Sequence, residues 1–221
     1  MLIVPIPNGQ FVENCYLVVD DAAGECAVVD PGEEAGLILH KLAATGAKPV
    51  AIWLTHAHLD HVLGVPRVAA ETGAPVWLHP ADRSLYDAVP EQAAWFGLAA
   101  PALLPPDAAF AHGETVRVGG LAFQVRHSPG HSPGSVCLVG PEGEGGGGSV
   151  RVVLGGDVLF AGSIGRTDLP GGDFDTLIGS IERELLSLPD DTIVYPGHGP
   201  ETTVGRERRS NPFLTDAHRF V

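Results

Sequence analysis

Lysine is almost missing from this chain of 221 residues, in which Lys41 and Lys48 are the only two. Acidic residues outnumber lysine and arginine by 27 to 13, and the formal net charge at pH 7 is −14. A protein that binds a nucleic-acid backbone presents clustered cations to the phosphates, and this sequence has no basic stripe. The composition argues against nucleic acid and favours a small molecule as the partner.

Cysteine is scarce, and long apolar runs are missing. Cys15, Cys26 and Cys137 are odd in number and form no CxxC pair, so a disulfide framework like that of small secreted proteins is not expected. No stretch approaches the roughly 20 apolar residues of a membrane-spanning helix, and the first residues lack a basic leader with an apolar core. We expect buried thiols, no membrane association and a cytoplasmic location.

Short apolar segments typical of strands alternate with amphipathic segments typical of helices, in two similar series. The first series predicts strands over 2–6, 15–20, 26–30, 50–55 and 74–79, and helices over 33–46, 63–73 and 80–89. The second predicts a hairpin over 115–118 and 121–128, strands over 135–140, 150–157 and 192–199, and a helix over 173–189. Residues 88–113, rich in Ala and Pro, give no clear pattern. Two sheets packed together with helices outside are the expected architecture.

Three of the 10 histidines lie in the segment LTHAHLDHVLG, residues 54–64. A buried strand precedes this segment, so its side chains lie on a loop at the end of a sheet, where sites on rigid scaffolds are usually built. Alternate residues of a tight loop can direct His56 and His58 to one point, and Asp60 and His61 to a neighbouring point. Imidazole and carboxylate ligands favour a borderline divalent cation such as zinc.

Further donors follow other predicted strands. His131, Asp157 and His198 each lie at a strand end. The ligand count is satisfied if His56, His58 and His131 bind one ion, Asp60, His61 and His198 bind a second, and Asp157 bridges both. This arrangement leaves a shared position for an attacking hydroxide, whose orientation Asp60 assists; in the alternative, Asp60 only supports the ligands. His79 ends a strand nearby and is a candidate for a supporting contact.

The motifs THAHLDH, PGHSPGS, GGDVLF and YPGHG resemble those of the metallo-β-lactamase superfamily over nearly the whole chain. The resemblance implies an α/β fold, an αββα sandwich of two mixed sheets with helices on both outer faces and a dinuclear site at one edge. The segments GSIGRTDLPGGD and GHGPETTVGRERRSNPF are most similar to the short glyoxalase II-like, or hydroxyacylglutathione hydrolase-like, members. We expect residues 1–221 to form a single hydrolase domain that lacks the C-terminal helical substrate region of full-length glyoxalase II.

The resemblance implies a metal-dependent hydrolase of acyl thioesters, with S-lactoylglutathione or a related hydroxyacyl thiol as substrate and two divalent ions, Zn²⁺ expected and Fe the alternative. A bridging Asp157 disfavours a true β-lactamase, and His58 stands where diiron oxygen reductases generally have an acid. A mononuclear-iron persulfide dioxygenase, a lactonase or other ester hydrolase, and a non-catalytic metal-binding domain stay open, as does the oligomeric state. Arg166 either binds a substrate carboxylate or forms a buried ion pair with Asp168.

Overall fold

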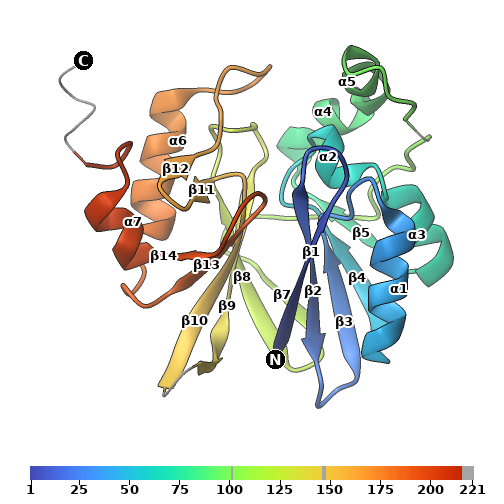
Figure 1. Ribbon diagram of the computed structural model, residues 1–221, viewed down its shortest axis with the longest axis horizontal. Coiled ribbons are helices and arrows are strands. Elements are labelled where there is room, and N and C mark those ends of the chain that lie inside the picture. The colour runs from blue at the N-terminus through green and yellow to red at the C-terminus, as the bar shows by residue number, and fades with distance from the viewer. Residues whose placement is uncertain (101, 146–147, 216–221) are drawn as a thin grey trace.

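Two β-sheets face each other in the computed structural model, and helices cover both outer faces (Figure 1). The structure describes residues 1–100, 102–145 and 148–215. Residues up to Ala109 form the first sheet and residues from Thr115 onward form the second. The expected αββα sandwich of mixed sheets is thereby confirmed.

The first sheet has the strand order β1-β2-β3-β4-β5-β6. β1, β2 and β3 pair antiparallel as a meander, whereas β3, β4, β5 and β6 pair parallel. Parallel neighbours need a crossover, and helices supply it between β3 and β5. The strands are β1 (Leu2–Asn8), β2 (Glu13–Asp20), β3 (Glu25–Val29), β4 (Lys48–Trp53), β5 (Val76–Leu78) and β6 (Ala108–Ala109).

The second sheet has the order β14-β13-β10-β9-β8-β7 and contains the predicted β7–β8 hairpin. Its strands are β7 (Thr115–Val118), β8 (Leu121–His127), β9 (Val136–Gly145), β10 (Gly148–Gly156), β13 (Ile193–Pro196) and β14 (Thr202–Thr203); β11 (Leu159–Phe160) and β12 (Ser163–Ile164) pair separately. β9 and β10 extend beyond the predicted ends at 140 and 150, because their backbones keep pairing into the glycine-rich segment.

The helices agree with the sequence pattern in place and differ in extent. They are α1 (Ala35–Thr45), α2 (Leu59–Val62), α3 (Val65–Thr72), α4 (Arg83–Asp87), α5 (Val89–Trp95), α6 (Phe174–Ser180) and α7 (Val204–Ser210), with a 3₁₀ turn at Pro80–Asp82 and a π-helical turn at Ile181–Leu185. The prediction of a single helix over 80–89 is wrong, because a 3₁₀ turn and α4 occupy most of this segment. A separate helix, α5, begins at Val89, and Pro90 lies in its first turn, where the backbone N–H that proline lacks would have no helical partner.

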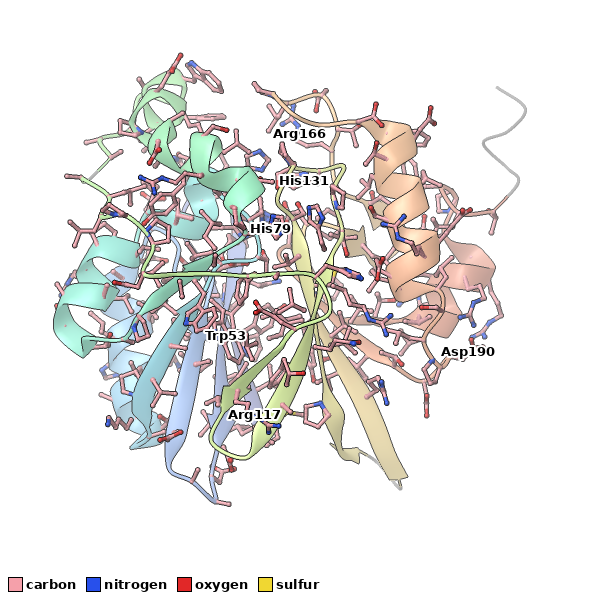
Figure 2. The ribbon with its side chains drawn as sticks, turned by 180° about the vertical axis from the view of Figure 1, so that it is seen from behind. Trp53, His79, Arg117, His131, Arg166 and Asp190 are labelled. Atoms are coloured by element: carbon pink, nitrogen blue, oxygen red, sulfur yellow. The ribbon has the colours of Figure 1, made fainter. Side chains whose placement is uncertain are left out.

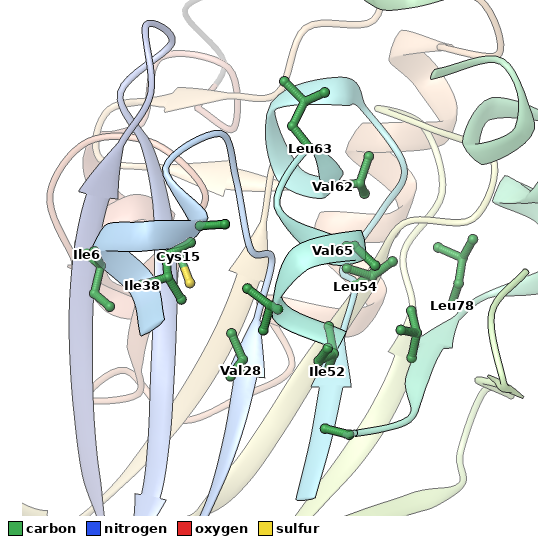
Figure 3. Close-up of a cluster of buried hydrophobic side chains, with 14 of the residues drawn as sticks. Ile6, Cys15, Val28, Ile38, Ile52, Leu54, Val62, Leu63, Val65 and Leu78 are labelled. Atoms are coloured by element: carbon green, nitrogen blue, oxygen red, sulfur yellow. The ribbon is translucent and has the colours of Figure 1, made fainter. Parts of the chain in front are cut away.

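Three apolar layers hold the sandwich together. Strand β2 is buried on both faces, with Leu17 and Val19 toward the helices and Tyr16 and Val18 toward the second sheet. Figure 3 shows part of the layer between the first sheet and its helices, where Ile38 of α1 lies beside Ile6 and Cys15 and Val65 of α3 lies beside Leu54. A third layer packs α6 and α7 on the second sheet. Because this layering buries both faces of the central strands, their sequences are nearly continuous apolar runs.

The three cysteines are free thiols buried in these layers, as predicted. Burial raises the pKa of Cys137 to about 12 and that of Cys26 to about 12. A thiol that stays protonated at neutral pH is a poor nucleophile. The cysteines therefore act as small apolar side chains. Among the described residues, no helix is both long enough and apolar enough to span a bilayer.

Candidate metal centre

The histidine-rich segment leaves β4 at the end of the first sheet and turns into the short helix α2. His58 is extended, with φ −72° and ψ 151°, and directly precedes α2. Asp60 and His61 consequently lie in the first helical turn, while His56 and His58 lie on the preceding loop. His56 and His61 are fully buried, and His58 is 7% exposed. Histidines rarely gather in an interior without a ligand or hydrogen-bond partners to satisfy them.

Three donors reach the same place from the second sheet. His131 follows β8, Asp157 follows β10 directly, and His198 follows β13. Figure 2 places His131 at the end of the sandwich opposite Arg117 of the β7–β8 hairpin. The fold thus brings together all seven side chains that the sequence predicted as ligands.

The first group consists of His56, His58 and His131, whose ring nitrogens converge. Nδ1 of His58 is 2.8 Å from Nε2 of His131, which is 3.2 Å from Nε2 of His56. Burial lowers the pKa of His58 to about 3 and that of His131 to about 4, and it holds the pKa of His56 well below its usual value. Neutral imidazoles present lone pairs, the form in which histidine binds a metal.

The second group consists of Asp60, His61 and His198. Oδ2 of Asp60 is 3.2 Å from Nε2 of His198 and 3.7 Å from Nε2 of His61. Burial opposes protonation of His61, but neighbouring carboxylates, Asp60 foremost, outweigh it and raise the pKa of His61 above its usual value. The second group is more anionic than the first and suits a cation.

Asp157 lies between the two groups. Its Oδ2 is 3.5 Å from Nε2 of His131 and 3.6 Å from Nε2 of His198, while its Oδ1 is 3.5 Å from Nε2 of His61. Burial raises the pKa of this carboxyl group above its usual value. One carboxylate thereby faces donors of both groups, as a bridging ligand would.

The donor set fits divalent metal ions on two grounds. Nε2 of His61 and Oδ1 of Asp157 are buried and have no hydrogen-bond partner among the described residues. Leaving such atoms unsatisfied costs about 1–3 kcal/mol each, a cost that a coordinated cation removes. Mixed imidazole and carboxylate donors also match the preference of zinc and of first-row transition metals. The cluster is therefore a metal-binding site by its chemistry, with room for two ions.

Asp30 is a supporting residue that the sequence interpretation missed. Its carboxylate accepts hydrogen bonds from the backbone N–H and hydroxyl of Thr55, at 2.7 and 2.6 Å, and lies 3.1 Å from Nδ1 of His61. Although Asp30 is near His56 and His61 in space, these contacts occupy its oxygens and make it an orienting group for His61. In the sequence, Asp30 could have been noticed as the acid that ends the predicted strand CAVVD. It therefore lies at the same edge of the sheet as the histidine-rich segment.

Asp82 is a second missed residue, fully buried beneath the first group. Its carboxylate accepts hydrogen bonds from Ala57 N–H at 2.9 Å, the Ser132 hydroxyl at 2.8 Å and Gly134 N–H at 2.5 Å. Ala57 separates His56 from His58, and Ser132 follows His131. One side chain therefore ties together the two loops that carry the first group. Nothing in the local sequence distinguishes Asp82 from a surface acid.

Glycines leave the space that the cluster occupies. A Cβ atom at Gly197 would lie 2.2 Å from Oδ1 of Asp157 and 2.7 Å from Cε1 of His61. A Cβ atom at Gly165 would lie 1.9 Å from the carbonyl oxygen of Asp157. Gly197 and Gly165 are thus required sterically: a side chain at position 197 would displace the carboxylate of Asp157, and one at position 165 would displace its backbone carbonyl.

Arg166 contributes to the site through its backbone. Its carbonyl oxygen lies 2.8 Å from Nδ1 of His131 and can accept a hydrogen bond that orients this ring. Its guanidinium forms a two-pronged pair with Asp168, at 2.7 and 2.8 Å. The expected pairing is present, but the expectation of burial is wrong, because the two side chains are 60% and 68% exposed; Figure 2 shows Arg166 at the edge of the molecule. His79, the candidate for a supporting contact, stacks on His127 with ring centroids 4.0 Å apart.

A cleft of about 570 Å³ opens above the cluster. Its floor contains His58, Asp60, His131, Asp157 and His198. One wall comes from the first half of the chain and the other from the segment after β10. The wall residues are Phe11, Leu59, Leu85, Ala88, Glu91, Gln92, Trp95 and Phe96 on one side, and Phe160, Ser163, Ile164, Arg166, Leu169 and Pro170 on the other. A candidate metal centre at the bottom of a concave, mainly apolar cleft is typical of an enzyme active site.

Known proteins share this sequence and architecture. The family model of the metallo-beta-lactamase superfamily matches residues 8–198. A hydroxyacylglutathione hydrolase GloC of Haemophilus influenzae is 41% identical over 211 residues, which cover 95% of this chain and 96% of the relative. The solved structure of TTHA1623 in a di-iron-bound form is 44% identical, with a TM-score of 0.82 over 96% of this chain and 100% of the other. The structure of the BLEG-1 B3 metallo-beta-lactamase is 38% identical, with a TM-score of 0.86 over 97% and 100%.

Proposed function

Because the chain belongs to the metallo-β-lactamase superfamily, we propose that it is a metallo-hydrolase that cleaves acyl thioesters. S-lactoylglutathione, or a related acyl thiol, is the proposed substrate. The observation that carries the proposal is the convergence of seven histidine and aspartate side chains, five of which form the floor of one cleft. The name of the GloC relative supports the reaction class.

We assign His56, His58 and His131 to one divalent ion, Asp60, His61 and His198 to a second, and Asp157 to both. Zinc is the proposed metal, and iron is the alternative that the di-iron-bound relative supports. When bound, the ions supply a water of lowered pKa and polarise the substrate carbonyl. The donor geometry supports this assignment, since each group of three lies within 4.8 Å, ligand atom to ligand atom.

The side chains of this chain orient the reacting atoms. Asp60 lines the cleft, so its carboxylate can accept a hydrogen bond from the attacking water and direct a lone pair at the carbonyl carbon. The backbone carbonyl of Arg166 and the carboxylate of Asp30 hold the rings of His131 and His61 in place. A thiolate can leave without protonation by a general acid, because the pKa of its conjugate thiol is well below that of an alcohol. The reaction thus needs neither a serine nor a cysteine nucleophile.

The test combines metal analysis with substrate turnover. Protein purified without added metal is assayed for metal content, then with thioesters, lactones, β-lactams and persulfides. We expect two ions per chain and hydrolysis of thioesters above the other classes. One iron per chain with rapid oxygen uptake on a persulfide would identify the dioxygenase alternative instead.

β-Lactam hydrolysis is the second candidate, because the chain is 38% identical to the BLEG-1 B3 metallo-beta-lactamase over nearly its full length. The water of lowered pKa that bound metal ions would supply suits attack on a lactam carbonyl as well as on a thioester carbonyl. Turnover of a β-lactam faster than of every thioester would replace our first proposal. Turnover of a lactone faster than of every thioester would likewise favour an ester hydrolase.

The net charge of −14 and the scarcity of lysine support a small molecule, rather than nucleic acid, as the partner. We further propose a cytoplasmic location. The three free, buried thiols support it, since thiols persist in a reducing compartment.

A further inference from the structure

The two walls of the cleft are apolar beyond the metal-binding floor. On one side, Phe11 of the loop between β1 and β2 meets Phe96 at the end of α5, with ring centroids 5.1 Å apart. Trp95 and Phe96 are 58% and 50% exposed, although aromatic side chains of this size usually gain from burial. On the opposite wall, Phe160, Ile164 and Leu169 face the same space. We call Phe11, Trp95 and Phe96 the aromatic wall.

Two neutral polar side chains line the walls, and contacts within the protein engage both. Gln92 accepts a hydrogen bond from Leu59 N–H and donates to the carbonyl oxygens of Ala57 and Leu85. The hydroxyl of Ser163 donates to the carbonyl of Ile164. The Gln92 side chain is therefore not free to recognise a polar group of a substrate, whereas the Ser163 hydroxyl, whose 3.4 Å bond links neighbouring residues, can still accept one hydrogen bond.

The charges of the walls do not favour an anion. Arg166 is the one cationic side chain among the described residues that line the cleft, and Asp168 already engages it with both carboxylate oxygens. Glu91 lines the same cleft and carries the opposite charge. Bound metal ions attract anions at the floor, where the carbonyl lies, whereas the carboxylates of a glutathione conjugate lie several bonds from the sulfur. Those carboxylates would meet the walls.

We propose that the cleft selects thioesters that are apolar and uncharged on both sides of the carbonyl, with the acyl chain held by the aromatic wall, over conjugates of glutathione. This inference rests on the proposed thioesterase function, and of the two substrates proposed above it favours a related acyl thiol over S-lactoylglutathione. An apolar chain gains about two- to fourfold in affinity for each methylene that the walls remove from water. Carboxylates lose solvation there without gaining a cation.

Binding of unreactive thioethers tests the inference apart from turnover. S-octyl-, S-butyl- and S-methyl-N-acetylcysteamine, together with S-octylglutathione, are titrated calorimetrically into the full chain, both metal-free and zinc-loaded. We expect Kd to fall about two- to fourfold per methylene from methyl to octyl. We also expect the octyl N-acetylcysteamine to bind at least about tenfold more tightly than S-octylglutathione. Equal affinity along the alkyl series, or tighter binding of S-octylglutathione, would overturn the inference.

Variants locate the effect. Trp95→Ala and Phe96→Ala should each weaken octyl binding about fivefold and leave methyl binding unchanged, because in the proposal these exposed rings hold the far end of a long chain. Phe174→Ala is the matched control: Phe174 is an exposed aromatic residue of α6 that does not line the cleft. Loss of octyl affinity in the control, equal to that in the wall variants, would contradict a role of the aromatic wall.

Charge is tested at Glu91. Glu91→Lys should strengthen binding of S-octylglutathione about three- to tenfold while changing S-octyl-N-acetylcysteamine binding little, since only the former carries carboxylates. An equal change for both ligands would count against the charge argument.

Turnover measurements separate the proposed function from the further inference. Hydrolysis of thioesters without any chain-length preference would refute the inference alone, whereas tight octyl binding with no thioester hydrolysis would refute the proposed function alone.

Discussion

At the scale of single residues, Asp157 differs from the other six proposed ligands because it faces both groups. Its two oxygens lie 3.5–3.6 Å from ring nitrogens of His61, His131 and His198. Each of those histidines belongs to one group only. Removing Asp157 therefore affects both groups, while removing His198 affects mainly the second.

We expect Asp157→Ala to lose both bound ions and His198→Ala to lose mainly one. The affinity loss in Asp157→Ala should exceed about 100-fold at each site, the upper range for removal of a merely supporting residue. Metal content after dialysis, measured by atomic emission, checks this. The exposed Asp168→Asn serves as the control and should keep both ions. Undiminished metal in Asp157→Ala would disprove the bridging assignment.

Asp82 allows a test that is specific to the first group. Asp82→Asn replaces an acceptor of three hydrogen bonds, so the loops of His58 and His131 lose their common tie. We expect metal affinity at the first site to fall about 10- to 100-fold with little change at the second. Competition with a chelator, together with anomalous scattering from crystals, gives the occupancy of each site.

Asp87→Asn is the control for Asp82→Asn, because Asp87 is an exposed acid of α4 that pairs with Arg83. It should leave both affinities unchanged. An equal loss at the two sites in Asp82→Asn would mean that Asp82 stabilises the whole fold instead of positioning the first group.

At the scale of elements, the site depends on how closely the ends of neighbouring strands approach one another. β10 and β13 pair parallel, so Asp157 and His198 leave the sheet at the same edge. Gly197 lies between β13 and His198, and its backbone N–H donates to the carbonyl of Gly156 at 2.8 Å. The approach leaves no space for a side chain at position 197.

Gly197→Ala should weaken metal binding at both sites even though alanine is small. Its Cβ atom would overlap Oδ1 of Asp157, and the carboxylate would have to leave its central position. Metal content and circular dichroism check this, and we expect folded protein with fewer ions than the parent. Gly179→Ala in α6 is the matched control, since nothing lies within 4 Å of its added Cβ and alanine favours a helix by about 1 kcal/mol. Normal metal content in Gly197→Ala would contradict the steric argument.

At the scale of the whole molecule, the cluster joins the two sheets. The first sheet supplies His56, His58, Asp60 and His61, and the second supplies His131, Asp157 and His198. Ions bound between them would crosslink the two halves. The assignment of residues 1–221 to one domain without a further helical region stays a prediction.

Metal removal should therefore lower the thermal stability. A ligand that binds only the folded state at a thousand times its Kd stabilises it by about 4 kcal/mol, which corresponds to a Tm shift of roughly 10 °C for a chain of this length. Differential scanning calorimetry with and without a chelator measures the shift, and added zinc should reverse it. An unchanged Tm, with metal shown to be removed, would indicate that the ions do not bridge the halves.

Sequence patterns were sufficient to predict the layered architecture, and they also supplied the seven side chains that we propose as ligands. The strands can be recognised in the sequence because both faces of the sheets are buried, which makes the strand segments apolar throughout. The HxHxDH motif can be recognised because its residues are neighbours along the chain. Tertiary structure alone decided which carboxylates support the site, where Arg166 points and what surrounds the substrate. Asp30, Asp82 and the aromatic wall are distant along the chain from the groups they serve. Their roles follow from burial and from neighbours that only the packing of the two sheets brings together.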